Sequence, residues 1–210
     1  MRALTHHRAG ANLVRMSDSA PEAPAGIHPD VWQAYLDAPE HMVVEILGGE
    51  LHVQPRPRPR HANVAGRLRR RLGSFDDPDP GEPGGWIILI EPELQLGPLD
   101  RPVVPDLCGW RRERLPEDFL DPAAIALAPD WVCEVLSERT RGTDRVKKQR
   151  IYHRAGVAHV WHVDPDARTF EVFRREAEGW TLVVEAEGTE HVRAPPFEAI
   201  ELDLARLWAI

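Results

Sequence analysis

Short apolar runs separated by Pro, Gly and Asp dominate the middle of this chain of 210 residues. Such runs predict buried β-strands. One of them, WVCEVL at Trp131–Leu136, is apolar at every position except one, so it predicts a strand that is covered on both faces. The other strands predicted in this part of the chain are Trp86–Leu96, with a bend at Pro92, Val103–Trp110 and Val157–Val163.

A repeat of apolar residues at four-residue steps, from Val64 to Leu72, predicts a helix over His61–Leu72, with arginines on its other faces. A second helix is predicted over Thr143–Ala155, with its first residue as the N-cap and Gly156 as the stop. Two shorter helices are expected at Pro29–Tyr35 and at the C-terminal segment ELDLARLW, residues 201–208.

Hairpins are predicted on both sides of this core. Met42–Val53 turns at Gly48-Gly49, and Thr169–Arg174 pairs with Trp180–Glu185 through the turn EAEG. The core order is helix, three strands, helix, strand, which is a mixed α/β pattern. We expect one domain over residues 27–210, preceded by a disordered segment over residues 1–26.

The composition narrows the class of protein. The chain is 42% hydrophobic, but no apolar run approaches the roughly 20 residues of a membrane span. Cys108 and Cys133 form no CxxC pair, which favours a reducing, cytoplasmic location over a disulfide framework or a zinc site. Met16 is a candidate for the true start, in which case residues 1–15 are not translated.

The net charge of −8 argues against a protein that coats nucleic acid in general, but the charge is unevenly distributed. No Asp or Glu occurs from Leu51 to Phe75, where arginines are frequent. These arginines are candidate contacts to a DNA backbone, and an ordinary solvated basic surface is an equally good interpretation. The candidates are Arg56, Arg58, Arg60, Arg67, Arg70 and Arg71.

Three charged residues interrupt apolar segments. Asp106 lies in VVPDLCGW, Glu134 lies in WVCEVL, and Lys148 shares one helical stripe with Ile151 and Tyr152. A carboxylate that is buried without a partner loses several kcal/mol of hydration, so we expect it to be protonated or paired with a cation. The pattern predicts that the three side chains meet.

Two carboxylates and a lysine meet the needs of metal-assisted phosphodiester hydrolysis. Hard oxygen ligands hold Mg²⁺ or Mn²⁺, and the metal activates water and neutralises charge on the phosphate. The lysine can orient the attacking water or stabilise the developing charge. A structural ion-pair cluster without catalysis explains the same spacing, and spacing alone favours it slightly.

A family resemblance is visible beyond this trio. The run PDWVCEVLS, then Asp144, Lys148 and Tyr152, then AGVAHVWHVDP, resembles the signature of the Uma-two family of restriction-endonuclease-like proteins. That family belongs to the PD-(D/E)XK nuclease superfamily. Glu45 with Gly49-Glu50 is similar to the hairpin motif of the family, and residues 59–61 are similar to its entry into the first long helix.

The resemblance covers roughly residues 30–175 and implies a restriction-endonuclease-like α/β core, a central mixed β-sheet flanked by helices with added β-hairpins. It implies a divalent-metal site, Mg²⁺ or Mn²⁺, at Asp106 and Glu134. It also implies that the lysine usually found two residues after the glutamate, where Leu136 stands, has moved to Lys148 on the next helix.

We therefore predict a Mg²⁺-dependent endonuclease that hydrolyses DNA, with Asp106, Glu134 and Lys148 as its catalytic residues. A homodimer is a candidate assembly, because cleavage of a duplex benefits from two sites related by symmetry. A catalytically silent module that binds nucleic acid or a protein partner is the main alternative, followed by a different metal hydrolase or an inert domain. There are three further candidate site residues. Glu45 is either an additional metal ligand or an exposed hairpin residue, and His61 is either a phosphate contact or a helix-start residue. Asp144 either pairs with Lys148 or supports the site from outside the metal ligands.

Overall fold

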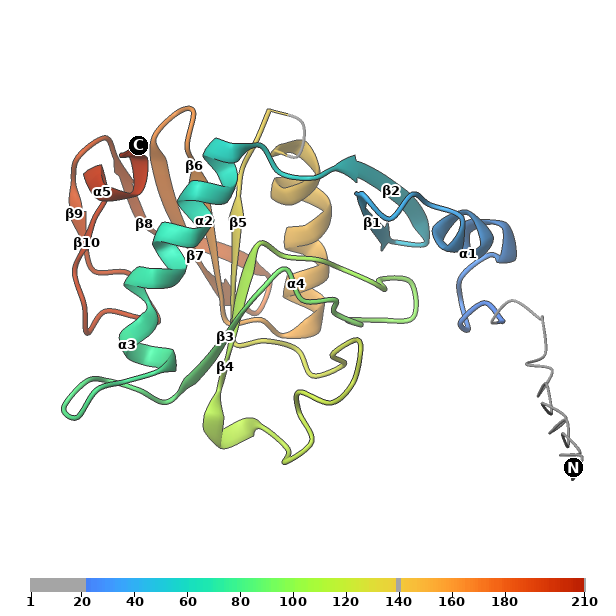
Figure 1. Cartoon of the computed structure of the whole chain (residues 1–210), viewed down its shortest axis with the longest axis horizontal. Helices are drawn as coiled ribbons and strands as arrows, with labels where there is room; N and C mark the ends of the chain where they lie inside the picture. The colour runs from blue at the N-terminus through green and yellow to red at the C-terminus, as the bar shows by residue number, and fades with distance from the viewer. Residues whose placement is uncertain (1–21, 139–140, 210) are drawn as a thin grey trace, which may run out of the picture.

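The computed structural model describes residues 22–138 and 141–209. Its centre is a six-stranded mixed sheet with the strand order β3-β4-β5-β6-β7-β8 (Figure 1). Only β5 and β6 are parallel, and every other neighbouring pair in this sheet is antiparallel. The strands are β3 (Trp86–Ile90), β4 (Leu107–Arg111), β5 (Trp131–Val135), β6 (His159–Asp164), β7 (Thr169–Glu176) and β8 (Gly179–Glu187).

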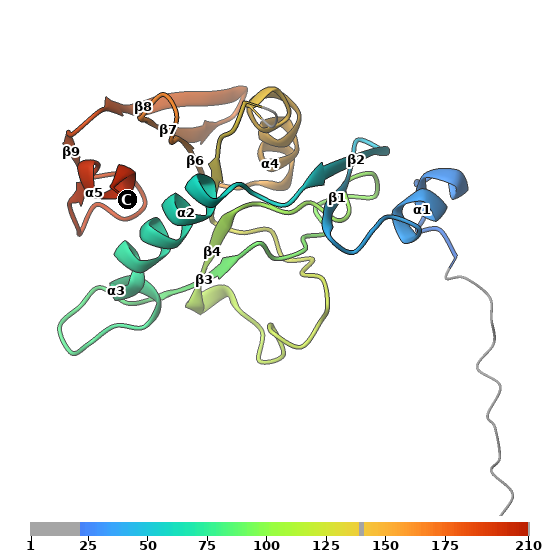
Figure 2. The same cartoon turned by 45° about the horizontal axis from the view of Figure 1, so that its top comes forward.

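Helices cover both faces of the sheet (Figures 1 and 2). Helix α2 (Pro59–Arg71) contributes Val64 and Leu68 to one apolar cluster. On the opposite face, the π-helical segment η2 (Thr143–Lys148) continues into α4 (Gln149–Ala155), which contributes Ile151 and Tyr152 to a second cluster. The parallel β5–β6 pair follows from this arrangement, because the η2–α4 helix carries the chain back across the sheet.

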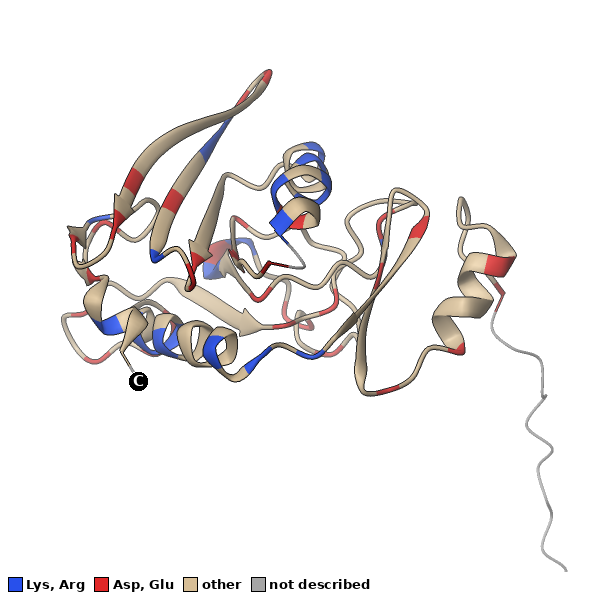
Figure 3. Ribbon diagram, turned by 90° about the horizontal axis from the view of Figure 1, so that it is seen from above, with Lys and Arg blue, Asp and Glu red and all other residues tan. Residues whose placement is uncertain are grey.

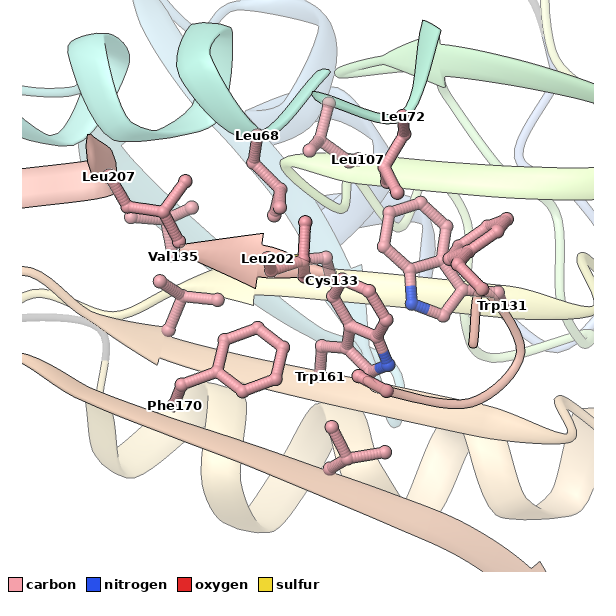
Figure 4. Close-up of a cluster of buried hydrophobic side chains, with 14 of the residues drawn as sticks. Leu68, Leu72, Leu107, Trp131, Cys133, Val135, Trp161, Phe170, Leu202 and Leu207 are labelled. Atoms are coloured by element: carbon pink, nitrogen blue, oxygen red, sulfur yellow. The ribbon is translucent and has the colours of Figure 1, made fainter. Parts of the chain in front are cut away.

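Alternating residues of β5 enter the two clusters. Trp131, Cys133 and Val135 pack against α2, and Figure 4 shows them below Leu68 and Leu72. Val132 belongs to the opposite cluster, and Glu134 follows it on that face. All five residues of β5 are buried, so the strand is covered on both faces as its sequence predicts.

A two-stranded sheet lies beside the core. Strands β1 (Met42–Leu47) and β2 (Glu50–Pro55) turn at Gly48 and Gly49, whose φ angles of 64° and 80° suit a tight hairpin turn. Helix α1 (Pro29–Leu36) packs against these strands, at the far end from the C-terminus in Figure 1.

Short elements complete the fold. They are α3 (Gly73–Asp76), the 3-10 turn η1 (Arg112–Arg114), β9 (His191–Val192), β10 (Leu202–Asp203) and α5 (Ala205–Trp208). No helix among the described residues is long and apolar enough to cross a bilayer.

The structure corrects several predicted boundaries. The strand predicted over Trp86–Leu96 ends at Ile90, because Glu91 adopts a positive φ of 47° and Pro92 cannot donate to a ladder. The strand predicted over Val103–Trp110 begins at Leu107, and Val103 forms only an isolated bridge with Leu94.

Two predicted helix features are also wrong. Thr143 is not an N-cap, because Gly142 before it already has helical dihedral angles. The helix predicted over residues 201–208 is shorter, since Leu202–Asp203 pairs with β9 and only α5 is helical. The predicted disordered segment and Met16 lie outside the described residues, except for residues 22–26.

Candidate active site

Strand register brings the two predicted metal carboxylates together. Leu107 of β4 pairs with Cys133 of β5, so the next residues along this ladder, Asp106 and Glu134, stand opposite each other just beyond the paired segment. Asp106 Oδ2 accepts a hydrogen bond from Val135 N at 2.6 Å, which ties the end of β4 to β5. The two carboxylates are neighbours although 28 positions separate them in the sequence.

Lys148 lies at the centre of the cluster, at the end of η2. Its Nζ is 3.0 Å from Glu45 Oε1, 3.3 Å from Glu134 Oε1 and 3.7 Å from Asp144 Oδ1. It also donates to the carbonyl oxygen of Val104 at 2.9 Å. With only 4% of its side chain exposed, this ammonium group has exchanged water for carboxylate and carbonyl oxygens.

The π-helical turn of η2 holds Asp144 and Lys148 on the buried side. Gln149 N donates to Asp144 O, five residues earlier, which is the hydrogen bond of a π-helix. Such turns are frequent at functional sites. The predicted pairing of Asp144 with Lys148 at four-residue spacing is present.

Glu45 joins the cluster from β1 of the hairpin. Backbone hydrogen bonds between Ile46 and residues 101–102 dock β1 against the loop before β4. Glu45 Oε1 accepts a hydrogen bond from Val104 N at 2.8 Å. The carboxylate is 1% exposed, so the interpretation of Glu45 as an exposed hairpin residue is wrong.

Tyr152 also lies beside these charged side chains, although the sequence pattern placed it with the apolar residues of the helical stripe. Its hydroxyl donates to Glu134 Oε1. Burial raises the pKa of Tyr152 well above its usual value, and the charge of Glu134 adds to this, so the hydroxyl keeps its proton and remains a donor. The available signal was its position four residues after Lys148, on the same helical face.

His61, in the first turn of α2, contacts Asp106. Its Nε2 lies 2.6 Å from Asp106 Oδ1. Burial alone would lower the pKa of His61, but the hydrogen bond to Asp106 and the charge of that carboxylate raise it above its usual value. A contact between His61 and phosphate stays a prediction, while the contact with Asp106 places His61 in the same site.

Carboxyl groups outnumber lysines at this site. Glu45, Glu134 and Asp144, which are buried, and the partly buried Asp106 are named here the acidic cluster, and Lys148 is the buried lysine among them. Burial raises the pKa of Glu134 well above its usual value, and Asp144 and Asp106 add to this, although Lys148 acts in the opposite direction. The carboxylates of the cluster raise the pKa of Lys148 well above its usual value, although burial alone would lower it. The lysine therefore stays charged, and Glu134 takes up a proton more readily than an ordinary glutamate does.

The acidic cluster forms the floor of a pocket of about 410 Å³. The segment Pro55–Arg60, which runs from the last residue of β2 into the first turn of α2, forms one wall and brings Arg56, Arg58 and Arg60 to it. Residues 136–138 and 165–166 contribute to the lining as well. The three arginines of this segment therefore share a pocket with the predicted catalytic residues Asp106, Glu134 and Lys148.

The other three predicted DNA-contacting arginines lie along α2 and do not line this pocket. Figure 3 shows Lys and Arg along both α2 and α4, on opposite sides of the sheet. Arg67 donates to the carbonyl oxygen of Arg206, whereas Arg70 is exposed. DNA contacts by Arg67, Arg70 and Arg71 stay predictions.

The donor set of the pocket fits a divalent cation by its chemistry. Its buried ligands are carboxylate oxygens, which Mg²⁺ and Mn²⁺ prefer, and a cation would supply the positive charge that the acidic cluster lacks. Within residues 22–138 and 141–209, no three His, Cys, Asp or Glu side chains are already arranged around a common metal position. Both oxygens of Asp106 are hydrogen-bonded, and Lys148 contacts Glu45 and Glu134.

Known proteins share the sequence pattern and the fold of this chain. A family model described as "Uma2: Putative restriction endonuclease" matches residues 32–205. A search of curated proteins found no match. Among solved structures, a putative nuclease belonging to DUF820 from Anabaena variabilis ATCC 29413 has a similar fold, with a TM-score of 0.67 and 22% sequence identity. The match covers 85% of this chain and 97% of that chain, and it agrees with the predicted restriction-endonuclease-like core.

Proposed function

The chain belongs to the Uma2 family, and from this membership and its acidic pocket we propose that it is a Mg²⁺- or Mn²⁺-dependent endonuclease that hydrolyses DNA phosphodiester bonds. Family membership supports a nuclease-like function. The observation that carries the proposal of metal-dependent DNA hydrolysis is the meeting of Asp106, Glu134 and Lys148 on the floor of one pocket whose wall holds arginines.

Asp106 and Glu134 would hold the metal ion, and Glu45 and Asp144 are further candidate ligands. When bound, the ion would lower the pKa of a water molecule and neutralise charge on the phosphate. Tyr152 and Lys148 fix the carboxylate of Glu134 from two sides, which limits its rotation within the buried floor. Such fixed donors stabilise charge without reorganising during the reaction.

Lys148 would act on the attacking water or on the charge that develops on the phosphate. Its raised pKa keeps it an ammonium group, so it serves as a hydrogen-bond donor and positive charge rather than as a base. The hydrogen bond to Val104 O and the surrounding carboxylates hold this charge at one place. Arg56, Arg58 and Arg60 would bind phosphates of the same strand.

One observation favours the alternative of a catalytically silent binding module. Lys148 is already surrounded by three carboxylates and a carbonyl oxygen, as expected of a closed structural cluster. Under this alternative, DNA binding is sensitive to salt and independent of metal. A homodimer stays a prediction under both functions.

The experiment that tests the proposal measures cleavage of plasmid DNA and of oligonucleotides by the purified chain with Mg²⁺ or Mn²⁺. We expect metal-dependent cleavage that falls by about 100-fold or more in Glu134→Gln, since loss of one electrostatic group in an active site costs this much. Lys147→Met is the matched control, because Lys147 is exposed and pairs with Glu50 outside the cluster.

A second measurement reports on the metal alone. Mn²⁺ should raise the melting temperature of the wild-type chain, by an amount equivalent to about 2.7 kcal/mol at 100 times its dissociation constant. Asp106→Asn should reduce this stabilisation. Absence of cleavage with either metal, or equal cleavage by wild type and Glu134→Gln, would contradict the nuclease proposal.

A further inference from the structure

Most side chains of the acidic cluster are buried at the pocket. The side chains of Glu45, Glu134, Asp144 and Lys148 are all 4% exposed or less. Asp106 is 14% exposed, and His61 beside it 11%, which makes them the outer members of the site. A phosphate that approaches the cluster therefore has to enter the pocket, because contact from the outer surface does not reach these carboxylates.

The segment Pro55–Arg60, named here the strap, spans the end of β2 and the start of α2 and borders the pocket. Pro55, Pro57 and Pro59 fix their own φ angles and keep the residues before them extended, so the strap is stiff. Two ion pairs connect the strap to the rest of the protein. Arg56 Nη1 lies 3.6 Å from Glu91 Oε2, and Arg60 Nη1 lies 3.3 Å from Asp166 Oδ1.

These two ion pairs hold the strap only weakly. Arg60 is 66% exposed and Asp166 58%, and water and salt screen such exposed pairs, so they contribute little to stability. A phosphate group can compete for Arg56 and Arg60, since both already lie at the pocket wall. Arg58, between them, has no ion pair or side-chain hydrogen bond among the described residues, so its guanidinium group is available to a ligand.

The volume of the pocket bears on whether it binds single-stranded or duplex DNA. A volume of about 410 Å³ is that of a pocket for one small molecule, for which the usual range is roughly 300–1,000 Å³. Both strands of duplex DNA are held in base pairs along a stiff rod with a persistence length of about 150 base pairs, so placing one of its phosphates deep in such a space requires a distortion of the duplex that costs free energy. An unpaired strand is flexible and can insert one nucleotide at a time.

We propose that the pocket takes a single DNA strand, passed between the strap and the acidic cluster, in preference to a duplex. This inference rests on the proposed function, since it names the form of DNA that the same site accepts. No Phe, Tyr or Trp is among the residues that line the pocket, so stacking on bases does not contribute. The pocket therefore binds the sugar-phosphate backbone, and we expect little dependence on base sequence and strong dependence on salt.

Fluorescence anisotropy of labelled oligonucleotides tests the inference. The wild-type chain is titrated, with Ca²⁺ in place of Mg²⁺, into a mixed-sequence single strand and into a blunt duplex of the same length and sequence. We expect the single strand to bind at least about tenfold more tightly at equal salt. Equal or tighter binding of the duplex would overturn the inference, as would tighter binding of an RNA strand of the same sequence.

Matched variants locate the binding. Arg58→Ala should weaken single-strand binding about threefold to tenfold through the loss of one phosphate contact. Arg175→Ala removes the same charge from the other end of β7, away from the turn at residues 165–166, and should leave binding unchanged. Equal losses in both variants would show binding outside the pocket and overturn the inference.

Cleavage assays with Mg²⁺ or Mn²⁺ separate this inference from the proposed function. Equal cleavage rates for the single strand and the duplex would overturn the inference and leave the nuclease activity in place. Tight single-strand binding that depends on Arg58, without cleavage of any DNA, would support the inference about the pocket and overturn the nuclease activity.

Discussion

The two faces of β5 are stabilised in different ways. On one face, Trp131, Cys133 and Val135 pack with α2 and with Trp161 and Phe170 (Figure 4). This hydrophobic packing is non-directional. On the other face, Glu134 is stabilised by two identified donors, Lys148 and Tyr152. One strand of five residues thus combines a packed core with a charged site. The charged face differs from the apolar face because its stability requires every hydrogen-bond and ion-pair partner of the buried charges.

The largest effect should follow from Lys148→Met, which tests the charged face. The variant leaves Glu45, Glu134 and Asp144 buried without their cation, so we expect a loss of about 3–5 kcal/mol in the free energy of unfolding. Urea unfolding at neutral pH measures it. The loss should shrink at acidic pH, where the carboxyl groups become protonated.

Lys147→Met is the control for this prediction, because the neighbouring lysine is 43% exposed and solvent screens its ion pair with the exposed Glu50. Equal stability losses in the two variants would show that the buried cluster has no special dependence on its lysine.

A loss of similar or smaller size should follow from Leu68→Ala on the apolar face. Leu68 is fully buried in the cluster between α2 and β5, and truncation of such a residue costs about 2–5 kcal/mol. In contrast to Lys148→Met, this loss should be the same at acidic and neutral pH. Leu182→Ala, at a leucine that is 43% exposed, serves as the control and should change stability by less than about 0.5 kcal/mol.

The smallest effect concerns the pH dependence of Glu134. Because its pKa is raised in the folded state, the stability that it contributes is complete below the ordinary value of 4.5 and is lost as the pH rises through the folded-state pKa. The stability of the wild type relative to Glu134→Gln should therefore decrease above pH 4.5. Urea unfolding of both chains from acidic to slightly alkaline pH measures this slope.

The exposed Glu185→Gln is the control for that slope and should give a difference that does not change with pH. A wild type that instead gains stability relative to Glu134→Gln as the pH rises would show that the folded protein holds Glu134 as a fully compensated carboxylate.

Local patterns predicted the parts of the site that depend on one element. The helical stripe placed Lys148 and Tyr152 on the buried face, and the single glutamate in an apolar run indicated a carboxylate with a cationic partner. Strand ends were less predictable. Asp106 lies just before β4, and its contacts with Val135 N and His61 come from segments 29 and 45 residues away.

The burial of Glu45 shows most clearly where sequence reasoning stops. In isolation, a glutamate in a two-stranded hairpin is exposed on one face or the other, and its alternation pattern carries no information about docking. The backbone pairing of Ile46 with residues 101–102 and the hydrogen bond from Val104 N place Glu45 against Lys148.

The sequence by itself determined the mixed α/β class, the family, and the identity of the charged residues that have to be compensated, because periodicity and the cost of burying charge are local properties. The tertiary structure alone decided that a hairpin carboxylate joins the cluster, that Asp106 stands opposite Glu134, and that a proline-rich strap borders the pocket. These features depend on strand register and on docking between distant segments, whose free energies arise only when the chain is folded.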